Sequence, residues 1–204
     1  MNRTRIVVAL GVAETLSWGA TYYLPATLAV PMAADLGIAP STVFAAFSCA
    51  LVVSALLGPW AGRRIDRLGG RGVLAAGNLV AAAGLVTMAL ATSAPMLFLA
   101  WIVVGAGMAF SLYEAAFSTL ARIFGREARG PITGITLIAG FASTVSWPVT
   151  SLVAAEFGWR AACLGWAAVL VGIALPLVLS LPRGEALPRT AVAAAGPAHD
   201  PAPI

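Results

Sequence analysis

The sequence contains no lysine, one histidine and two cysteines, and only 10% of its 204 residues are charged. A Ser–His dyad inside a membrane needs an intramembrane histidine, and a zinc site needs several His, Cys or carboxylate ligands together. The one histidine, His199, lies near the C-terminus among prolines and alanines. A phosphate-binding loop that ends in lysine cannot occur in a chain without lysine. We therefore expect no enzyme activity, no metal site and no cofactor.

Hydrophobic residues are abundant instead: they make up 60% of the chain, and the mean hydropathy is +0.94. Soluble chains contain about 45–50% apolar and about 25% charged residues. The composition therefore predicts an integral membrane protein. The net charge of +4 raises the question of nucleic acid binding, but the arginines form short clusters between apolar runs. This pattern is typical of membrane topology signals, so we expect a lipid bilayer and no nucleic acid as the partner.

Six runs are long and apolar enough to be membrane-spanning helices, which need about 20 mostly apolar residues. The connections between them are short, so consecutive helices should be antiparallel. The predicted fold is an all-α six-helix transmembrane bundle over residues 1–181, followed by a disordered, proline-rich cytoplasmic tail over residues 182–204. The predicted helices cover residues 6–30, 41–60, 72–92, 95–120, 131–155 and 161–181.

The arginines predict the orientation of this bundle. Eleven of the twelve precede the first run, follow the last run, or lie in the second and fourth connections; Arg160 alone is on the other side. Cytoplasmic loops are enriched in Lys and Arg, so both termini should face the cytoplasm, in a cytoplasmic (inner) membrane. The first run is long for a signal peptide and carries Glu14 in its middle, so we expect it to be retained.

The connection between the second and third runs, GRRIDRLGGR, places five charges in ten residues. Glycines permit tight turns, and an aspartate can accept hydrogen bonds from helix-end amides or pair with an arginine. In composition, spacing and location this loop resembles the signature loop of the major facilitator superfamily. The residues that carry the resemblance are Gly62, Asp66, Arg67, Gly69 and Arg71.

The resemblance extends over residues 6–181 and implies a role for this loop. In the family the loop is a cytoplasmic latch, which would pair Asp66 with Arg122 at the end of the fourth helix. The alternative is a simple turn that only marks the cytoplasmic side. The segments FGWRAA and ARIFGREARG are similar to the monocarboxylate-transporter-like branch.

Family members have two six-helix halves, whereas this chain resembles the amino-terminal one. The resemblance thus implies a further partner. We expect a second six-helix half, separate or missing, or a second copy of the same chain.

Polar residues form one stripe on each of three predicted helices, at a spacing that places them on one face. Such a stripe belongs against protein or a water-filled cavity rather than lipid. The resemblance places the first and fourth helices around a central substrate cavity. The candidate cavity residues are Glu14, Trp18 and Thr21 on the first helix, Ser111 and Glu114 on the fourth, and Thr136 and Ser143 on the fifth.

The two intramembrane acids suggest proton coupling, because a carboxyl group in such a cavity can take up a proton from one side and release it to the other. The alternatives are a structural hydrogen bond for Glu14 and an ion pair with Arg122 for Glu114. The predicted function is a secondary active transporter that moves a small organic solute by alternating access. A non-transporting scaffold or a channel is the competing interpretation. The branch resemblance suggests an organic acid, yet two acids and no intramembrane arginine suit an anion poorly.

Overall fold

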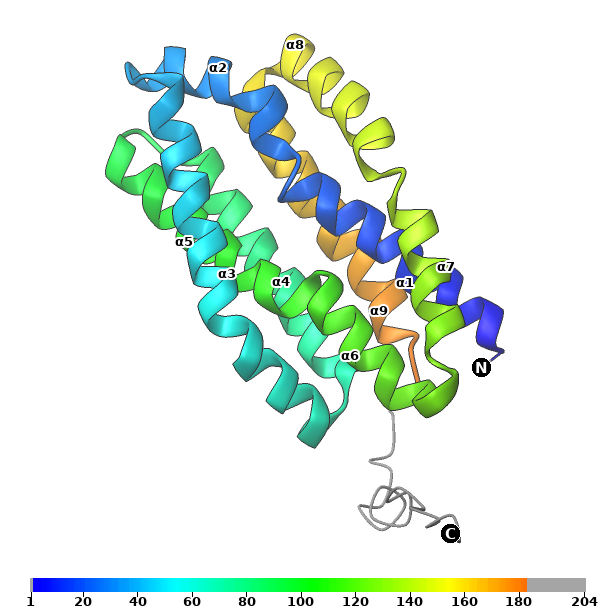
Figure 1. The fold of residues 1–204 in the computed structure, drawn as a ribbon. Helices are drawn as coiled ribbons and strands as arrows, with labels where there is room; N and C mark the ends of the chain where they lie inside the picture. The colour runs from blue at the N-terminus through cyan, green and yellow to red at the C-terminus, as the bar shows by residue number, and fades with distance from the viewer. Residues whose placement is uncertain (1, 183–204) are drawn as a thin grey trace, which may run out of the picture.

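The computed structural model describes residues 2–182, which contain nine α-helices, one 3₁₀ turn and one π-helical segment, and no strand within that range. The predicted all-α membrane fold is confirmed. Of the predicted tail, residues 183–204 lie outside the described residues. The N-terminus and the last described residues lie at the same end of the bundle (Figure 1).

The helices form six rods that run alternately up and down the bundle (Figure 1). Each rod corresponds to one predicted run. In chain order they are α1 (Arg3–Ala20) with α2 (Leu24–Leu36); α3 (Pro40–Leu68); α4 (Gly70–Ala89); α5 (Ala94–Ser111) with α6 (Tyr113–Phe124); α7 (Arg129–Ala139) with the first arm of α8 (Ala142–Val169); and the second arm of α8 with η2 (Leu170–Ala174) and α9 (Leu175–Leu179). The short 3₁₀ turn η1 (Gly125–Glu127) joins the fourth and fifth rods.

Four continuous helical stretches of the described chain are long and apolar enough to cross a membrane. The last one, Arg129–Leu179, contains two rods, because the chain reverses at Gly158 with φ 83° and ψ 164° inside α8. The first rod is interrupted at residues 21–23, just before α2. Pro25 lies in the first turn of α2 and has no amide hydrogen to continue the helix of α1.

The turn between the second and third rods is much shorter than predicted. Helix α3 continues to Leu68, so Gly62 lies inside a helix, and the predicted turn at this residue is wrong. Arginine is a good helix former, and its long side chain can hold its charge at the headgroup level from a helix. The chain reverses at Gly69, whose φ of 86° lies in the region that favours glycine.

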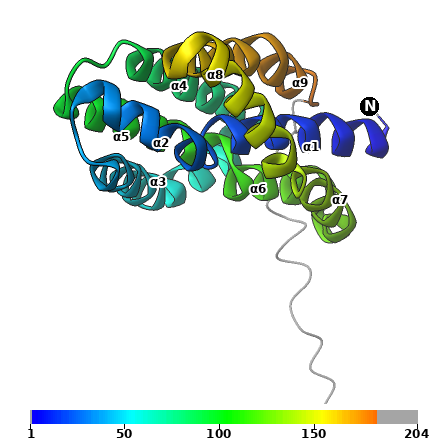
Figure 2. The ribbon, with the colours of Figure 1, turned by 90° about the horizontal axis from the view of Figure 1, so that it is seen from above.

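Small residues bring the central helices into close contact. A Cβ on Gly105 of α5 would lie 2.3 Å from the main-chain oxygen of Ala50 in α3. Gly77 and Gly107 make equally close approaches between α4 and α5. Close packing at small residues is the usual way in which helices associate inside a membrane. Helix α1 runs through the middle of the bundle and packs against α7, α8 and α9 (Figure 2).

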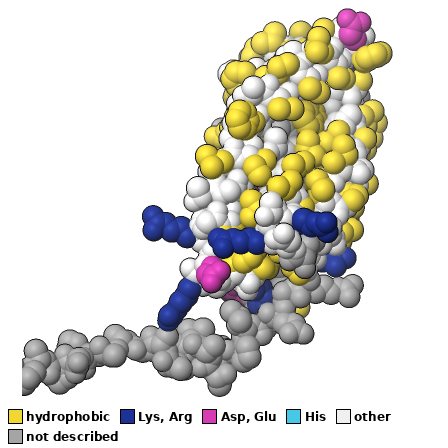
Figure 3. Space-filling view, turned by 90° about the vertical axis from the view of Figure 1, so that its right-hand side faces the viewer, with side chains coloured by type: hydrophobic (Ala, Val, Ile, Leu, Met, Phe, Trp, Pro, Cys, Tyr) yellow, Lys and Arg dark blue, Asp and Glu magenta, His cyan; other side chains and the backbone are white. Residues whose placement is uncertain are grey.

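The charges are separated along the bundle. In Figure 3 the basic side chains gather at the end that holds the start of α1 and the last described residues, and the body of the visible face is mostly hydrophobic. Arg160 lies at the other end, where its guanidinium pairs with Asp35, donates to the main-chain oxygen of Ala91 (2.9 Å) and lies 4.3 Å from the Trp159 ring centroid. The one arginine that departs from the sidedness pattern thus joins three segments of the chain.

Candidate functional site

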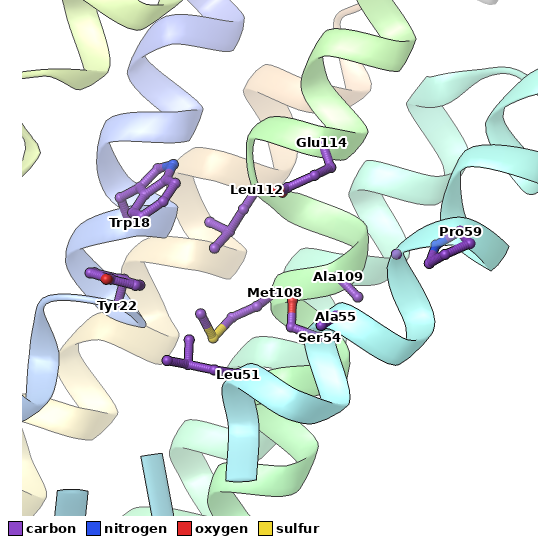
Figure 4. A pocket seen from close by; sticks show the side chains of 11 residues that line it. Trp18, Tyr22, Leu51, Ser54, Ala55, Pro59, Met108, Ala109, Leu112 and Glu114 are labelled. Carbon is purple, nitrogen blue, oxygen red and sulfur yellow. The ribbon is translucent and has the colours of Figure 1, made fainter. Parts of the chain in front are cut away.

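A pocket of about 560 Å³ lies between α1, α3 and the junction of α5 with α6 (Figure 4). Two helix interruptions, the one after α1 and the one between α5 and α6, lie beside it. The residues that line it are Trp18, Tyr22, Leu51, Ser54, Ala55, Gly58, Pro59, Met108, Ala109, Leu112 and Glu114.

The interruption of the fourth rod places an acid at this pocket. Leu112 has extended backbone angles (φ −95°, ψ −170°) and separates α5 from α6. Glu114 therefore lies in the first turn of α6. The amide groups of a helix N-terminus carry partial positive charge and stabilise an acidic side chain there. Glu114 is exposed and is the one charged residue among those that line the pocket.

Aromatic rings surround the α1 side of the pocket. The Trp18 ring centroid lies 5.0 Å from that of Tyr22 and 4.8 Å from that of Tyr113. Tyr113 in turn stacks on Phe117 at 5.0 Å with an interplanar angle of 11°. Trp18 and Tyr22 come from the end of α1 and the interruption that follows, and Met108 and Leu51 lie across the pocket from them (Figure 4).

Glu14 lies elsewhere than its stripe predicts. Its side chain is 1% exposed, inside the bundle, and it is not among the residues that line the pocket. The described chain therefore covers it without a second half. Its Oε2 atom and the Nε1 atom of Trp18, one turn further along α1, are both buried without a hydrogen-bond partner among the described residues.

The other predicted polar residues of the first and fourth rods, Thr21 and Ser111, are buried, and each forms a hydrogen bond within its own rod. The Thr21 hydroxyl donates to the main-chain oxygen of Ser17 (2.7 Å), and that of Ser111 donates to Gly107 (2.9 Å). The Ser17 hydroxyl donates to Asn78 Oδ1 on α4 at 3.1 Å, an interhelical bond. These side chains satisfy backbone or helix–helix contacts, which is a structural role.

The stripe of the fifth rod is separate from the pocket. Thr136 on α7 is exposed and donates to the main-chain oxygen of Ile132 at 2.9 Å. Ser143, at the start of α8, is half-buried. Neither residue lines the pocket. Of the seven predicted cavity residues, the structure thus brings Trp18 and Glu114 together.

The predicted latch loop is docked on α6, but not through the predicted ion pair. Arg122 Nη1 donates to the main-chain carbonyl of Asp66. Among the described residues no basic group pairs with the Asp66 carboxylate, which is exposed. Arg67 is also exposed and Arg71 is half-buried. The expected pair between the Asp66 carboxylate and the Arg122 guanidinium is therefore replaced by a bond from Arg122 to the Asp66 main chain. Asp66 lies in the last turn of α3.

The sequence analysis missed the α3 side of the pocket. Leu51, Ser54, Ala55 and Gly58 occupy positions i, i+3, i+4 and i+7 on one face of α3, and Pro59 follows. The sequence signal for this face is the spacing of the small residues Ser54, Ala55 and Gly58 within an otherwise bulky apolar run. Such spacing is typical of a helix face that leaves room for a neighbour.

The comparison with known families agrees with the geometry of the six rods. A sequence profile described as Major Facilitator Superfamily matches residues 10–203. The chain belongs to the major facilitator superfamily. It is also 31% identical over 175 residues to an "Uncharacterized 38 kDa protein in 23S RNA operon" of Thermoproteus tenax. That match covers 83% of this chain and 45% of the Thermoproteus tenax protein, so the chain spans about half the length of this relative.

Proposed function

We propose that this major facilitator protein is a secondary active transporter that moves a small organic solute across the cytoplasmic membrane by alternating access. The observation that carries the proposal is the pocket between α1, α3 and the α5–α6 junction. It joins a charged side chain, two aromatic rings and an apolar wall inside a membrane bundle. Intramembrane ionisable residues mark substrate or ion pathways, and pockets of roughly 300–1,000 Å³ suit small organic ligands.

Two helix interruptions support a pocket that changes shape. Discontinuous helices form the substrate sites of many secondary transporters, since irregular backbone is tolerated only where it lines a cavity or is covered by protein. The junction at Leu112 and the one at residues 21–23 both lie at the pocket. Rotation of α6 or α2 about these points would alter access to the pocket.

Glu14 is the proposed proton carrier. It is buried in the same region, with an unpartnered oxygen atom. Glu114, the charged residue that lines the pocket, lies in the first turn of α6. We propose that uptake and release of this proton accompany solute binding at Glu114.

The functional unit, we propose, contains a second bundle, either another six-helix half or a second copy. Large hydrophobic side chains are exposed along α3 and the fifth rod, with Leu56 at 74% and Leu152 at 67%. Lipid can cover such residues, but the exposed acid Glu114 at the pocket is better covered by protein. We propose that both termini face the cytoplasm, since the start of α1 and the last described residues lie at the basic end of the bundle.

The proposal is tested with membrane vesicles that contain the chain, an imposed pH gradient, and a defined mixture of organic amines, carboxylates and neutral solutes. Mass spectrometry then measures which solutes accumulate. We expect accumulation of at least one class, abolished when the gradient is collapsed. Passive, non-saturating flux would instead favour a channel, and no flux of any class would contradict transport.

A further inference from the structure

We infer that the pocket takes a hydrophobic organic cation. This inference rests on the proposed transport function and narrows it to one substrate class. It departs from the organic acid that the branch resemblance suggests. Three properties of the described residues support it: the sign of the charge in the pocket, the rings beside that charge, and the apolar character of the remaining wall.

The charge at the pocket is negative. Glu114 is the one charged side chain of the eleven residues that line it, and neither arginine nor histidine is among them. The nearest basic residue along α6, Arg122, lies two turns further on and is bound to the main-chain carbonyl of Asp66. In a site of low dielectric an anion would be repelled here and a cation attracted.

Aromatic rings lie next to this charge. Trp18 and Tyr22 line the pocket with their rings 5.0 Å apart, and Tyr113 packs against Trp18 at 4.8 Å. A cation over the face of tryptophan or tyrosine is attracted by the ring quadrupole, and this is a common way to bind organic ammonium groups. The rings therefore supply a second contact for the same charge.

The rest of the wall indicates an organic cation rather than a metal ion. Leu51, Met108 and Leu112 provide apolar contacts, and Ala55 and Ala109 leave space for ligand volume. Hard metal ions need several oxygen ligands, and no group of three or more potential ligands occurs in the described part of the chain. Methionine adapts its shape to different apolar partners. The pocket thus fits a bulky apolar ligand with one positive charge.

The test uses two probes that differ in the sign of their charge but hardly in size or shape, tetraphenylphosphonium and tetraphenylborate. Saturable binding of each is measured by equilibrium dialysis against purified protein in detergent, with protein-free micelles subtracted. The comparison is made between the unaltered chain and Glu114→Gln. We expect this change to weaken phosphonium binding roughly five- to thirtyfold, and to leave borate binding unchanged or stronger.

Four further variants separate the contributions of the charge and of the ring. Glu114→Asp should keep most of the phosphonium affinity, and Glu156→Gln, which removes an exposed acid from α8 away from the pocket, should have no effect. Trp18→Ala should weaken phosphonium binding, with partial recovery in Trp18→Phe. The circular dichroism spectrum and the elution volume of each variant show that it is folded.

The inference is overturned if Glu114→Gln leaves phosphonium binding unchanged, or if the unaltered chain binds borate saturably and the phosphonium ion does not. These outcomes would leave the proposed function standing, with an anionic or neutral substrate. Failure of transport itself is a different result, namely that no class of solute accumulates in the vesicle assay.

Discussion

Arg122 Nη1 donates to the main-chain carbonyl of Asp66, so the turn between α3 and α4 is held on α6 through the backbone. The carboxylate of Asp66 is exposed and takes no part in this bond. The family resemblance leads to the expectation of a carboxylate–guanidinium latch. In this structure the turn is held by the side chain of Arg122 and only by the main chain of Asp66.

The first prediction follows from this asymmetry. Arg122→Gln should accelerate hydrogen exchange of the amides in residues 66–70 by roughly tenfold, since a hydrogen bond to a charged donor is lost. Asp66→Asn should change this exchange rate by less than about twofold, because the main-chain carbonyl that accepts from Arg122 remains. Hydrogen–deuterium exchange with mass spectrometry makes the comparison. Equal acceleration in the two variants would restore the carboxylate as the partner of Arg122.

The second prediction concerns the glycines that follow the turn. A Cβ at Gly70 would lie 1.9 Å from Thr119 Oγ1 on α6, whereas one at Gly72 meets no atom within 4 Å. Gly70→Ala should lower stability by about 1–3 kcal/mol through overpacking. Gly72→Ala, in the same helix, should be neutral or stabilising by up to about 1 kcal/mol. Thermal unfolding midpoints in detergent test the pair, and equal midpoints would contradict the close packing of α4 on α6.

The third prediction addresses proton coupling. Glu14→Gln keeps the size and polarity of a side chain that is 1% exposed but removes its ionisation. The variant should insert normally and lose solute accumulation driven by the pH gradient, while exchange of solute without a gradient continues. Glu156→Gln is the matched control, because this acid is exposed on α8. Unchanged gradient-driven accumulation in Glu14→Gln would assign Glu14 a structural role.

The fourth prediction concerns Arg160 at the opposite end of the bundle. Its pair with Asp35 is partly exposed, with side-chain exposures of 39% and 46%, so Asp35→Asn should cost less than about 1 kcal/mol. Arg160→Ala should cost more, since it also removes the bond to the Ala91 carbonyl and the contact with the Trp159 ring. Unfolding midpoints of the two variants decide the order; an equal loss would show that the ion pair dominates.

Much of the fold could be predicted from the sequence. Long apolar runs and clustered arginines are strong signals, and the six runs correspond to the six rods. The extent of the turns was harder to predict. Five charges in ten residues suggested a loop, yet arginines are compatible with a helix that extends beyond the apolar run, so α3 continues to Leu68.

The site could be predicted only in part. Helical periodicity placed Trp18 and Glu114 on polar stripes, and the family resemblance implied that these stripes face a cavity. Both residues line the pocket. The same periodicity placed Glu14 on one stripe with Trp18, but Glu14 does not line the pocket. The prediction also treated each membrane span as one straight helix, which does not hold for the fourth rod. The interruption at Leu112 has no proline or glycine between residues 108 and 114 to signal it, and it rotates α6 relative to α5. The burial of Glu14 depends on packing between distant segments, which a single helical pattern does not contain.

Alternating exposure of the pocket is the central claim, and sided labelling of one cysteine tests it most directly. Ser54→Cys would be placed in the pocket of a chain that also carries Cys49→Ala and Cys163→Ala. A membrane-impermeant maleimide is then applied to right-side-out and to inverted membrane vesicles. The account predicts labelling from both sides, slowed in both by a bound solute. A cysteine that reacts from one side only, or from neither, would contradict it.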